Sequence, residues 1–204
     1  MLHRLLCVVC LAAALSSLTE ATVSAQDKPV RVRGTIERVE GDVYVIKARG
    51  GGELKVTLAD KAPVTAVVKA SLADVKQGSY VGIASMPQAD GSQKALEVLI
   101  FPEAMRGVGE GHYGWDLQPA SMMTNGNVEQ TVTSVDGQVL SVKYKDGEKK
   151  IVVPPDVPIV AFVPGDKEEL KPSAAIFVAA AKPQPDGSVQ APRIAVGRGI
   201  VPPM

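Results

Sequence analysis

The sequence predicts an all-β protein made of two tandem five-stranded barrels, joined by a connector rich in Gly and Met. The first observation is a series of short runs in which apolar and polar residues alternate between turn residues, a pattern typical of strands. The second is an internal repeat: residues 36–47 align without gaps with 132–143, and residues 87–92 align with 183–188, both at an offset of 96 residues. A period this long exceeds the roughly 20 to 50 residues of a solenoid unit, so we interpret the copies as a duplicated domain.

The first copy, at residues 29–101, is expected to contain strands and one helical turn. Its first two strands meet at a turn at residues 40–42, and its closing hairpin surrounds Asp90-Gly91, a dipeptide that favours tight turns. Ser71 is a candidate cap for the short helix, which ends before Gly78. The expected strands cover residues 30–39, 43–48, 54–58, 80–86 and 95–101, with an extended segment at 64–69.

The second copy, at residues 128–204, is expected to follow the same order with a weaker helix, because Pro172 falls where the first copy has its helical turn. Its expected strands cover residues 129–135, 139–144, 149–153, 176–181 and 193–196, with an extended segment at 157–163. Each copy therefore has three strands, a short helix and two strands. This is the order of an OB-fold, a small and partly open Greek-key barrel.

Both copies resemble the OB-like domains of unknown function that occur in exported bacterial proteins. The resemblance rests on the opening hairpin, on the stretch from Ser71 to Val81, and on the closing hairpin at Asp90-Gly91. The whole chain, including residues 109–116 and 121–125, is similar to a group of short exported proteins from proteobacteria, some of which are labelled metal transporter permease. The resemblance implies an OB-like fold and gives no activity.

The first 25 residues have the pattern of a signal peptide. Arg4 precedes an apolar run at residues 5–15, and residues 23–25 have the small-x-small pattern that signal peptidase accepts. We therefore expect residues 1–25 to be removed and the protein to be exported to the periplasm. Both cysteines lie in this leader, which excludes disulfides, thiolate catalysis and cysteine-based metal sites in the mature chain. The longest later apolar run, residues 174–181, is far short of the roughly 20 residues of a membrane span.

Residues 102–127 lie between the copies and hold most of the rare side chains. We expect this connector to be ordered and to pack against one or both barrels, with Tyr113 and Trp115 as anchors. The alternative is a copper-type metal site, because thioethers and imidazoles are ligands that suit Cu(I). Its candidate ligands are Met105, His112, Met122 and Met123.

The connector contains no recognisable catalytic set. Residues 109–114 match the letters of the dinucleotide motif G-x-G-x-x-G, but Pro119 disfavours the helix that must follow them. His112 is the only histidine after the leader. Its neighbours Asp116 and Ser121 lie in the same Gly-rich loop, whereas a catalytic set must be held on separate rigid elements.

The balance of charged residues argues against nucleic acid as a partner. The chain has 22 Lys and Arg against 22 Asp and Glu, so it lacks the basic surface that nucleic acid requires. The sequence therefore predicts a non-enzymatic exported protein with a binding or scaffolding role in the cell envelope and no bound cofactor. Its expected partner is an envelope protein or a small ligand. A periplasmic soft-metal protein that binds copper through the connector is the alternative.

Overall fold

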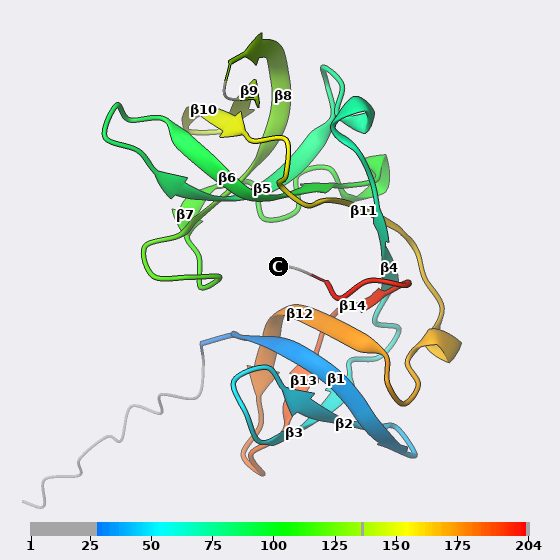
Figure 1. Ribbon diagram of the computed structural model, residues 1–204. Helices are drawn as coiled ribbons and strands as arrows, with labels where there is room; N and C mark the ends of the chain where they lie inside the picture. The colour runs from blue at the N-terminus through cyan, green and yellow to red at the C-terminus, as the bar shows by residue number, and fades with distance from the viewer. Residues whose placement is uncertain (1–27, 136, 203–204) are drawn as a thin grey trace, which may run out of the picture.

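The computed structural model describes residues 28–135 and 137–202, so the expected leader at residues 1–25 lies outside the described residues. Regular structure there consists of strands and short 3-10 turns, which confirms the predicted all-β class (Figure 1). The earlier strands are β1 (Val30–Glu40), β2 (Val43–Ala48), β3 (Glu53–Leu58), β4 (Val64–Lys69), β5 (Tyr80–Pro87), β6 (Gln93–Ile100) and β7 (Gly111–Gly114). The later strands are β8 (Met122–Ser134), β9 (Gly137–Tyr144), β10 (Gly147–Val153), β11 (Ile159–Pro164), β12 (Ala175–Pro183), β13 (Val189–Ala191) and β14 (Ile194–Gly197).

Five strands close the first barrel, which is the lower one in Figure 1. β1 pairs antiparallel with β2 and with β12, β2 pairs with β3, and β12 pairs with β13. The ring closes where β13 runs parallel to β3, with Val189 opposite Val56. β12 pairs in addition with β14.

Five other strands close the second barrel, the upper one in Figure 1. The antiparallel meander β8, β9 and β10 stands beside the hairpin of β5 and β6, and β5 pairs with β8. The ring closes where β10 runs parallel to β6, with Ile151 opposite Gln93. All five strands come from residues 80–153, a continuous part of the chain.

This pairing departs from the tandem arrangement that the repeat suggested. The expected barrels were residues 29–101 and 128–204, but the first barrel joins β1, β2 and β3 to β12 and β13 from the other end of the chain. The second barrel joins the closing hairpin of the first copy to the meander of the second copy. The connector at residues 102–127 therefore links strands of one barrel and does not join the two barrels. Because both copies carry the same strand pattern, a closing hairpin fits the meander of either copy.

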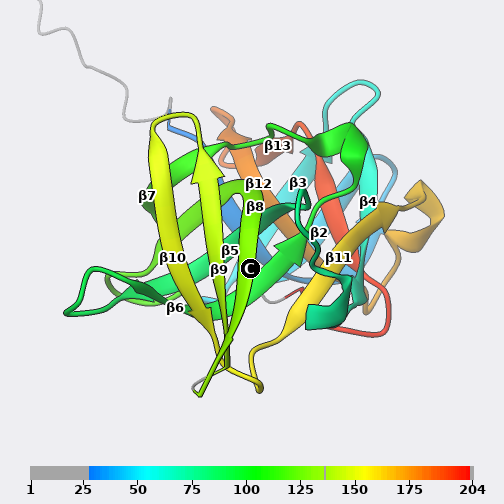
Figure 2. The ribbon, with the colours of Figure 1, turned by 90° about the horizontal axis from the view of Figure 1, so that it is seen from above.

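Two crossing strands, β4 and β11, carry the chain from one barrel to the other. They pair antiparallel, with Val160 opposite Lys69 and Pro164 opposite Thr65. β4 also pairs with β14, and β11 pairs with β6, so the hydrogen-bonded sheet continues between the barrels. Figure 2, which views the molecule from above, shows β4 and β11 on the same side of it.

Short 3-10 turns provide the helical structure of the described residues. Ser71, the expected cap, precedes η2 (Leu72–Asp74), and η4 (Lys167–Glu169) is the corresponding turn in the second copy. Next to these turns, Val75 packs into the core of the second barrel and Leu170 into the core of the first. Within residues 28–135 and 137–202, no helix has the length and apolar character needed to cross a bilayer.

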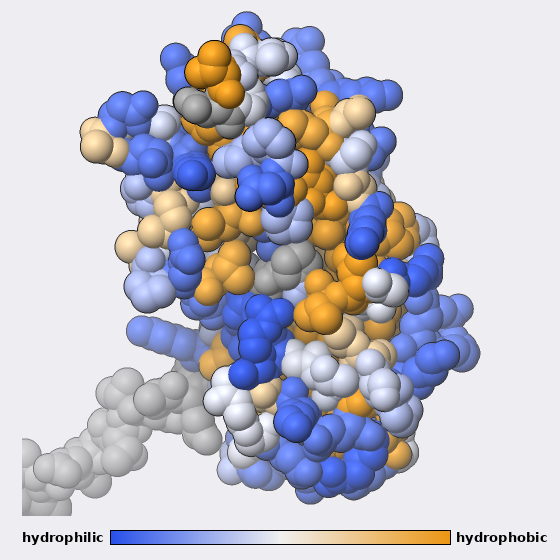
Figure 3. Space-filling view, in the orientation of Figure 1, coloured by the Kyte–Doolittle hydropathy of each residue, from blue (hydrophilic) through white to orange (hydrophobic). Residues whose placement is uncertain are grey.

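Buried apolar side chains form three clusters, one inside each barrel and one between them. The clusters inside the barrels are almost entirely aliphatic. In Figure 3, hydrophobic residues also reach the surface near the level where the barrels meet. The third group, which we call the inter-barrel cluster, consists of Val67, Ala84, Leu99, Met105, Met123, Val160, Phe162, Phe177 and Ala195.

Candidate functional site

The connector at residues 102–127 is ordered and extends the second barrel. β7 pairs antiparallel with β8, with Tyr113 opposite Met123 and His112 opposite Thr124. Because side chains alternate across a strand, these two pairs lie on opposite faces. Met123 belongs to the inter-barrel cluster and Tyr113 packs against it. On the other face, Nδ1 of His112 lies 2.8 Å from the hydroxyl of Thr124.

The four candidate metal ligands are divided between these two faces. Met105 and Met123 lie in the inter-barrel cluster. The His112 ring stacks on Tyr144 on the other face, and alternation along β8 places Met122 on that face as well. The fold therefore does not assemble the four side chains into one site. Over the described part of the chain, no group of three or more His, Cys, Asp or Glu residues is suited to hold a metal ion.

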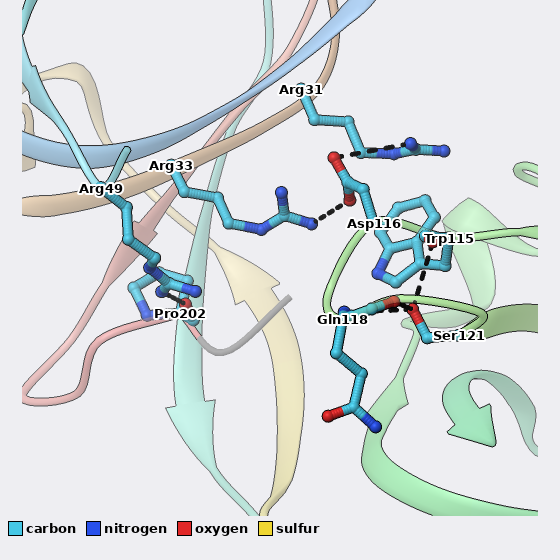
Figure 4. A network of polar contacts seen from close by, with 8 residues as sticks. All are labelled: Arg31, Arg33, Arg49, Trp115, Asp116, Gln118, Ser121 and Pro202. Atoms are coloured by element: carbon cyan, nitrogen blue, oxygen red, sulfur yellow. Dashed lines mark hydrogen bonds and ion pairs between the residues drawn. The ribbon is translucent and has the colours of Figure 1, made fainter. Parts of the chain in front are cut away.

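Trp115 anchors the connector on the first barrel. The Arg31 guanidinium lies 3.8 Å from the centroid of the indole ring, a cation–π contact, and the Phe177 ring lies 6.4 Å away in an edge arrangement. Asp116 accepts a 2.7 Å hydrogen bond from Arg33 and lies 3.7 Å from Arg31 (Figure 4). Although burial opposes ionisation, the Arg33 hydrogen bond holds the pKa of the Asp116 carboxyl below its usual value. Strand β1 thus holds a loop that belongs to the other barrel.

A cavity of about 430 Å³ lies where the two barrels, the connector and the crossing strands meet. We call it the inter-barrel cavity. Its exposed lining residues, which mark its opening, are Val108, Gly109, Ala179, Ala180 and Pro192. Large apolar side chains of both barrels and of the connector form its wall, among them Leu99, Phe101, Met105, Met123, Phe162 and Phe177.

The few polar groups of the cavity wall are mostly hydrogen-bond donors. Arg31 and Arg193 both line it, and no Asp or Glu is found among the described residues that do so. Asn125 lines it as well, and its Nδ2 donates hydrogen bonds of 3.3 Å to the Val108 carbonyl and the Tyr113 hydroxyl. Burial raises the pKa of the Tyr113 phenol, which stays neutral and available as a donor.

Three buried polar atoms of the cavity-lining residues have no hydrogen-bond partner within the described structure: Nε of Arg31, Nε1 of Trp115 and Oδ1 of Asn125. Buried polar atoms are nearly always paired with protein or with water, because an unpaired one costs about 1–3 kcal/mol. All three atoms belong to residues that line this one cavity, although each atom is itself almost completely covered by protein.

A buried carboxylate lies near this interface. Glu97 in β6 is 1% exposed, and neither of its oxygens has a hydrogen-bond partner among the described residues. The register places it opposite Ala84, a member of the inter-barrel cluster. Burial raises the pKa of the Glu97 carboxyl to about 8, against the opposing effect of Arg33 and Arg49. Glu97 is therefore mainly protonated at neutral pH.

The sequence prediction placed the site in the connector and missed the residues that other segments contribute. Four of these residues line the cavity from other segments. They are Arg31 in β1, Phe162 in β11, Phe177 in β12 and Arg193 in the turn that follows β13. One signal was present: the 96-residue offset aligns Glu97 with Arg193, a charge in the same place of an apolar segment in each copy. A charge within a buried strand pattern marks a position with a special environment.

Comparison of the chain with protein-family models, with curated proteins and with solved structures gave no match.

Proposed function

We propose that this protein is a non-enzymatic, exported binding protein whose site is the inter-barrel cavity, and that its ligand is a small, largely apolar molecule. The observation that carries the proposal is the cavity of about 430 Å³ at the junction of both barrels and the connector. Small-molecule sites typically have about 300–1,000 Å³, apolar walls and a few polar groups, and they occur preferentially where domains meet.

The wall of the cavity supports a ligand with rings or a flat apolar body. Phe101 and Phe162 are in edge contact, with ring centroids 5.5 Å apart, and Met105 and Met123 stand beside them. Aromatic rings provide large contact areas with few rotatable bonds, and thioether side chains adapt to irregular ligand shapes. Ordering the connector against both barrels keeps this wall in place before the ligand arrives, which reduces the entropy cost of binding.

The order of the strands in each barrel supports an OB-like fold. Each ring contains three consecutive antiparallel strands closed by a hairpin, and this order supports two OB-like barrels that exchange their closing hairpins. OB-like barrels are widely used to hold ligands on one side of the barrel. The periplasmic location rests on the signal-peptide pattern of residues 1–25.

The copper-type alternative has less support, because the fold separates His112 and Met122 from Met105 and Met123. A purely scaffolding role is also less favoured, since a scaffold gains nothing from an open apolar cavity at its centre.

Binding of the neutral fluorescent probe N-phenyl-1-naphthylamine to the mature protein tests the proposal. We expect saturable binding that the Ala180→Trp substitution weakens at least about tenfold, because the exposed Ala180 lines the cavity opening and an indole there blocks it. Ala89→Trp, at an exposed turn outside the cavity, is the matched control and should leave binding unchanged. Equal binding to both variants, or no binding of any naphthalene probe, would contradict the proposal.

A further inference from the structure

The inter-barrel cavity has a one-sided charge. Two arginines, Arg31 and Arg193, line it, and the described lining residues include no Asp or Glu. The surrounding wall is apolar, so these charges act in a medium with less screening than water. A site of this kind favours a ligand that carries a negative charge and disfavours a cation.

The two arginines differ in what already neutralises them. Arg31 lies 3.7 Å from the Asp116 carboxylate and over the face of Trp115. Arg193 is half-buried, and among residues 28–135 and 137–202 it has no ion pair and no side-chain hydrogen bond. A partly buried guanidinium without a partner is costly, because it has lost part of its hydration and has gained no carboxylate in return. An anion that binds in the cavity would compensate Arg193 for the hydration that it has lost.

A second polar position faces the cavity from the second barrel. Asn125 is 6% exposed, its Nδ2 is already used, and its Oδ1 is the buried acceptor that lacks a partner. This acceptor requires a hydrogen-bond donor such as an N–H or O–H group. Less than 1 Å² of this oxygen is accessible, so it lies beneath the cavity surface and a bound ligand does not reach it. The partnerless charged donor among the described cavity-lining residues is therefore Arg193.

We infer that the ligand of the inter-barrel cavity is a small aromatic or short-chain apolar acid, whose acidic group binds the Arg193 guanidinium and whose apolar body lies against Phe101 and Phe162. The planar guanidinium suits a carboxylate or sulfonate, with which it forms two parallel hydrogen bonds. This inference rests on the proposed function, because it names the ligand class of the same cavity.

Two probes with the same ring system separate the charge from the apolar body. 1-Anilinonaphthalene-8-sulfonate and N-phenyl-1-naphthylamine share their rings and their N–H group and differ in the sulfonate. We expect the mature protein to bind the sulfonate probe about ten- to a hundredfold more tightly than the neutral probe, as a charge-assisted hydrogen bond would give.

Substitutions of Arg193 test whether this residue causes the preference for the sulfonate probe. Arg193→Met should remove most of the preference for the sulfonate and leave the affinity for the neutral probe nearly unchanged, while Arg193→Lys should keep part of it. Arg38→Met, which removes an exposed arginine outside the cavity, is the matched control and should change neither affinity. Cooperative thermal unfolding of each variant verifies that the probes report on the folded protein, since anilinonaphthalene sulfonate also binds partly folded states.

The outcomes distinguish the two proposals. If neither probe binds, or if Ala180→Trp leaves binding intact, the proposed function itself fails. If the neutral probe binds in the cavity as tightly as the sulfonate, or if Arg193→Met keeps the sulfonate preference, the cavity remains a binding site and the acidic ligand class is wrong.

Discussion

The interiors of the two barrels and the space between them are built from different side chains. Inside the barrels, buried side chains are nearly all Val, Ile, Leu and Ala. Between the barrels, the cluster contains Phe162, Phe177, Met105 and Met123, with Tyr113 and other partly buried rings packed against it. The barrel interiors hold no buried charge, whereas the buried Glu97 lies on the inter-barrel side within the described structure.

This difference separates stability from binding. Branched aliphatic side chains interdigitate closely between sheet surfaces and fill a small barrel. Rings and thioethers at the junction leave a cavity of about 430 Å³, and the junction also holds unpaired polar atoms that a purely stabilising core would avoid. The barrels therefore act as rigid walls, and the space between them as the place where a ligand is held.

The largest expected effect is a difference between two leucines. Leu140 is fully buried inside the second barrel, and Leu99 is 1% exposed but lines the inter-barrel cavity. We expect Leu140→Ala to lower the free energy of unfolding by about 3–5 kcal/mol, because the closely packed barrel cannot collapse around the hole. Leu99→Ala should cost about 2 kcal/mol, since its side chain has fewer packing partners to lose. Urea denaturation measures both values, and equal losses would show that the junction is packed as tightly as the barrel.

A smaller effect is expected from the buried acid. The pKa of Glu97 is about 8 in the folded state and about 4.3 in an unfolded chain. Between these pH values the folded protein keeps a proton that the unfolded chain has lost, so stability falls as pH rises through this window. Glu97→Gln should remove this fall and leave the variant about 1–3 kcal/mol more stable than the wild type at pH 8.5.

Denaturation at pH 6 and at pH 8.5 checks this expectation. Glu129→Gln replaces an exposed carboxylate on β8 and serves as the control, which should keep the pH dependence of the wild type. If Glu97→Gln loses as much stability between the two pH values as the wild type does, a group other than Glu97 causes the pH dependence.

The smallest expected effect concerns the ion pairs that hold the connector. Asp116 is 48% exposed where it meets Arg33 and Arg31, so Asp116→Asn should cost less than about 1 kcal/mol. The emission of Trp115, the only tryptophan, should nevertheless shift to longer wavelength and become easier to quench, because the loop is held less firmly. Asp42→Asn breaks the exposed ion pair with Lys167 and should leave this emission unchanged. An unaltered Trp115 spectrum in Asp116→Asn would mean that packing alone holds the loop.

Much of the local structure was predictable from the sequence. The alternation of apolar residues located β1 to β6 within two residues, and Asp90-Gly91 located the hairpin between β5 and β6. The start of β8 was missed by seven residues, because it begins at Met122 and not at residue 129. Its first part contains Thr124 and Asn125, which are buried although polar, so hydropathy gave no sign of a strand there.

The site was predictable only in part. Met105, Tyr113, Trp115 and Met123 line the cavity and were singled out because they are rare side chains in one segment. Arg193 lies in a distant segment, and nothing in its immediate neighbours indicates a ligand. Residues that converge from distant strands are recognisable as a site only when the pairing of those strands is known.

The sequence by itself determined the all-β class, the turns and most strand boundaries, because these depend on the side-chain period and on local turn chemistry. Only the tertiary structure decided which hairpin closes which barrel, as β13 pairs with β3 and β6 pairs with β10 across the two copies. Strand pairing uses backbone hydrogen bonds that every residue offers, and two copies with the same apolar pattern present equivalent partners. The crossing strands β4 and β11 pair with each other between the barrels, and the cavity lies where they meet both barrels.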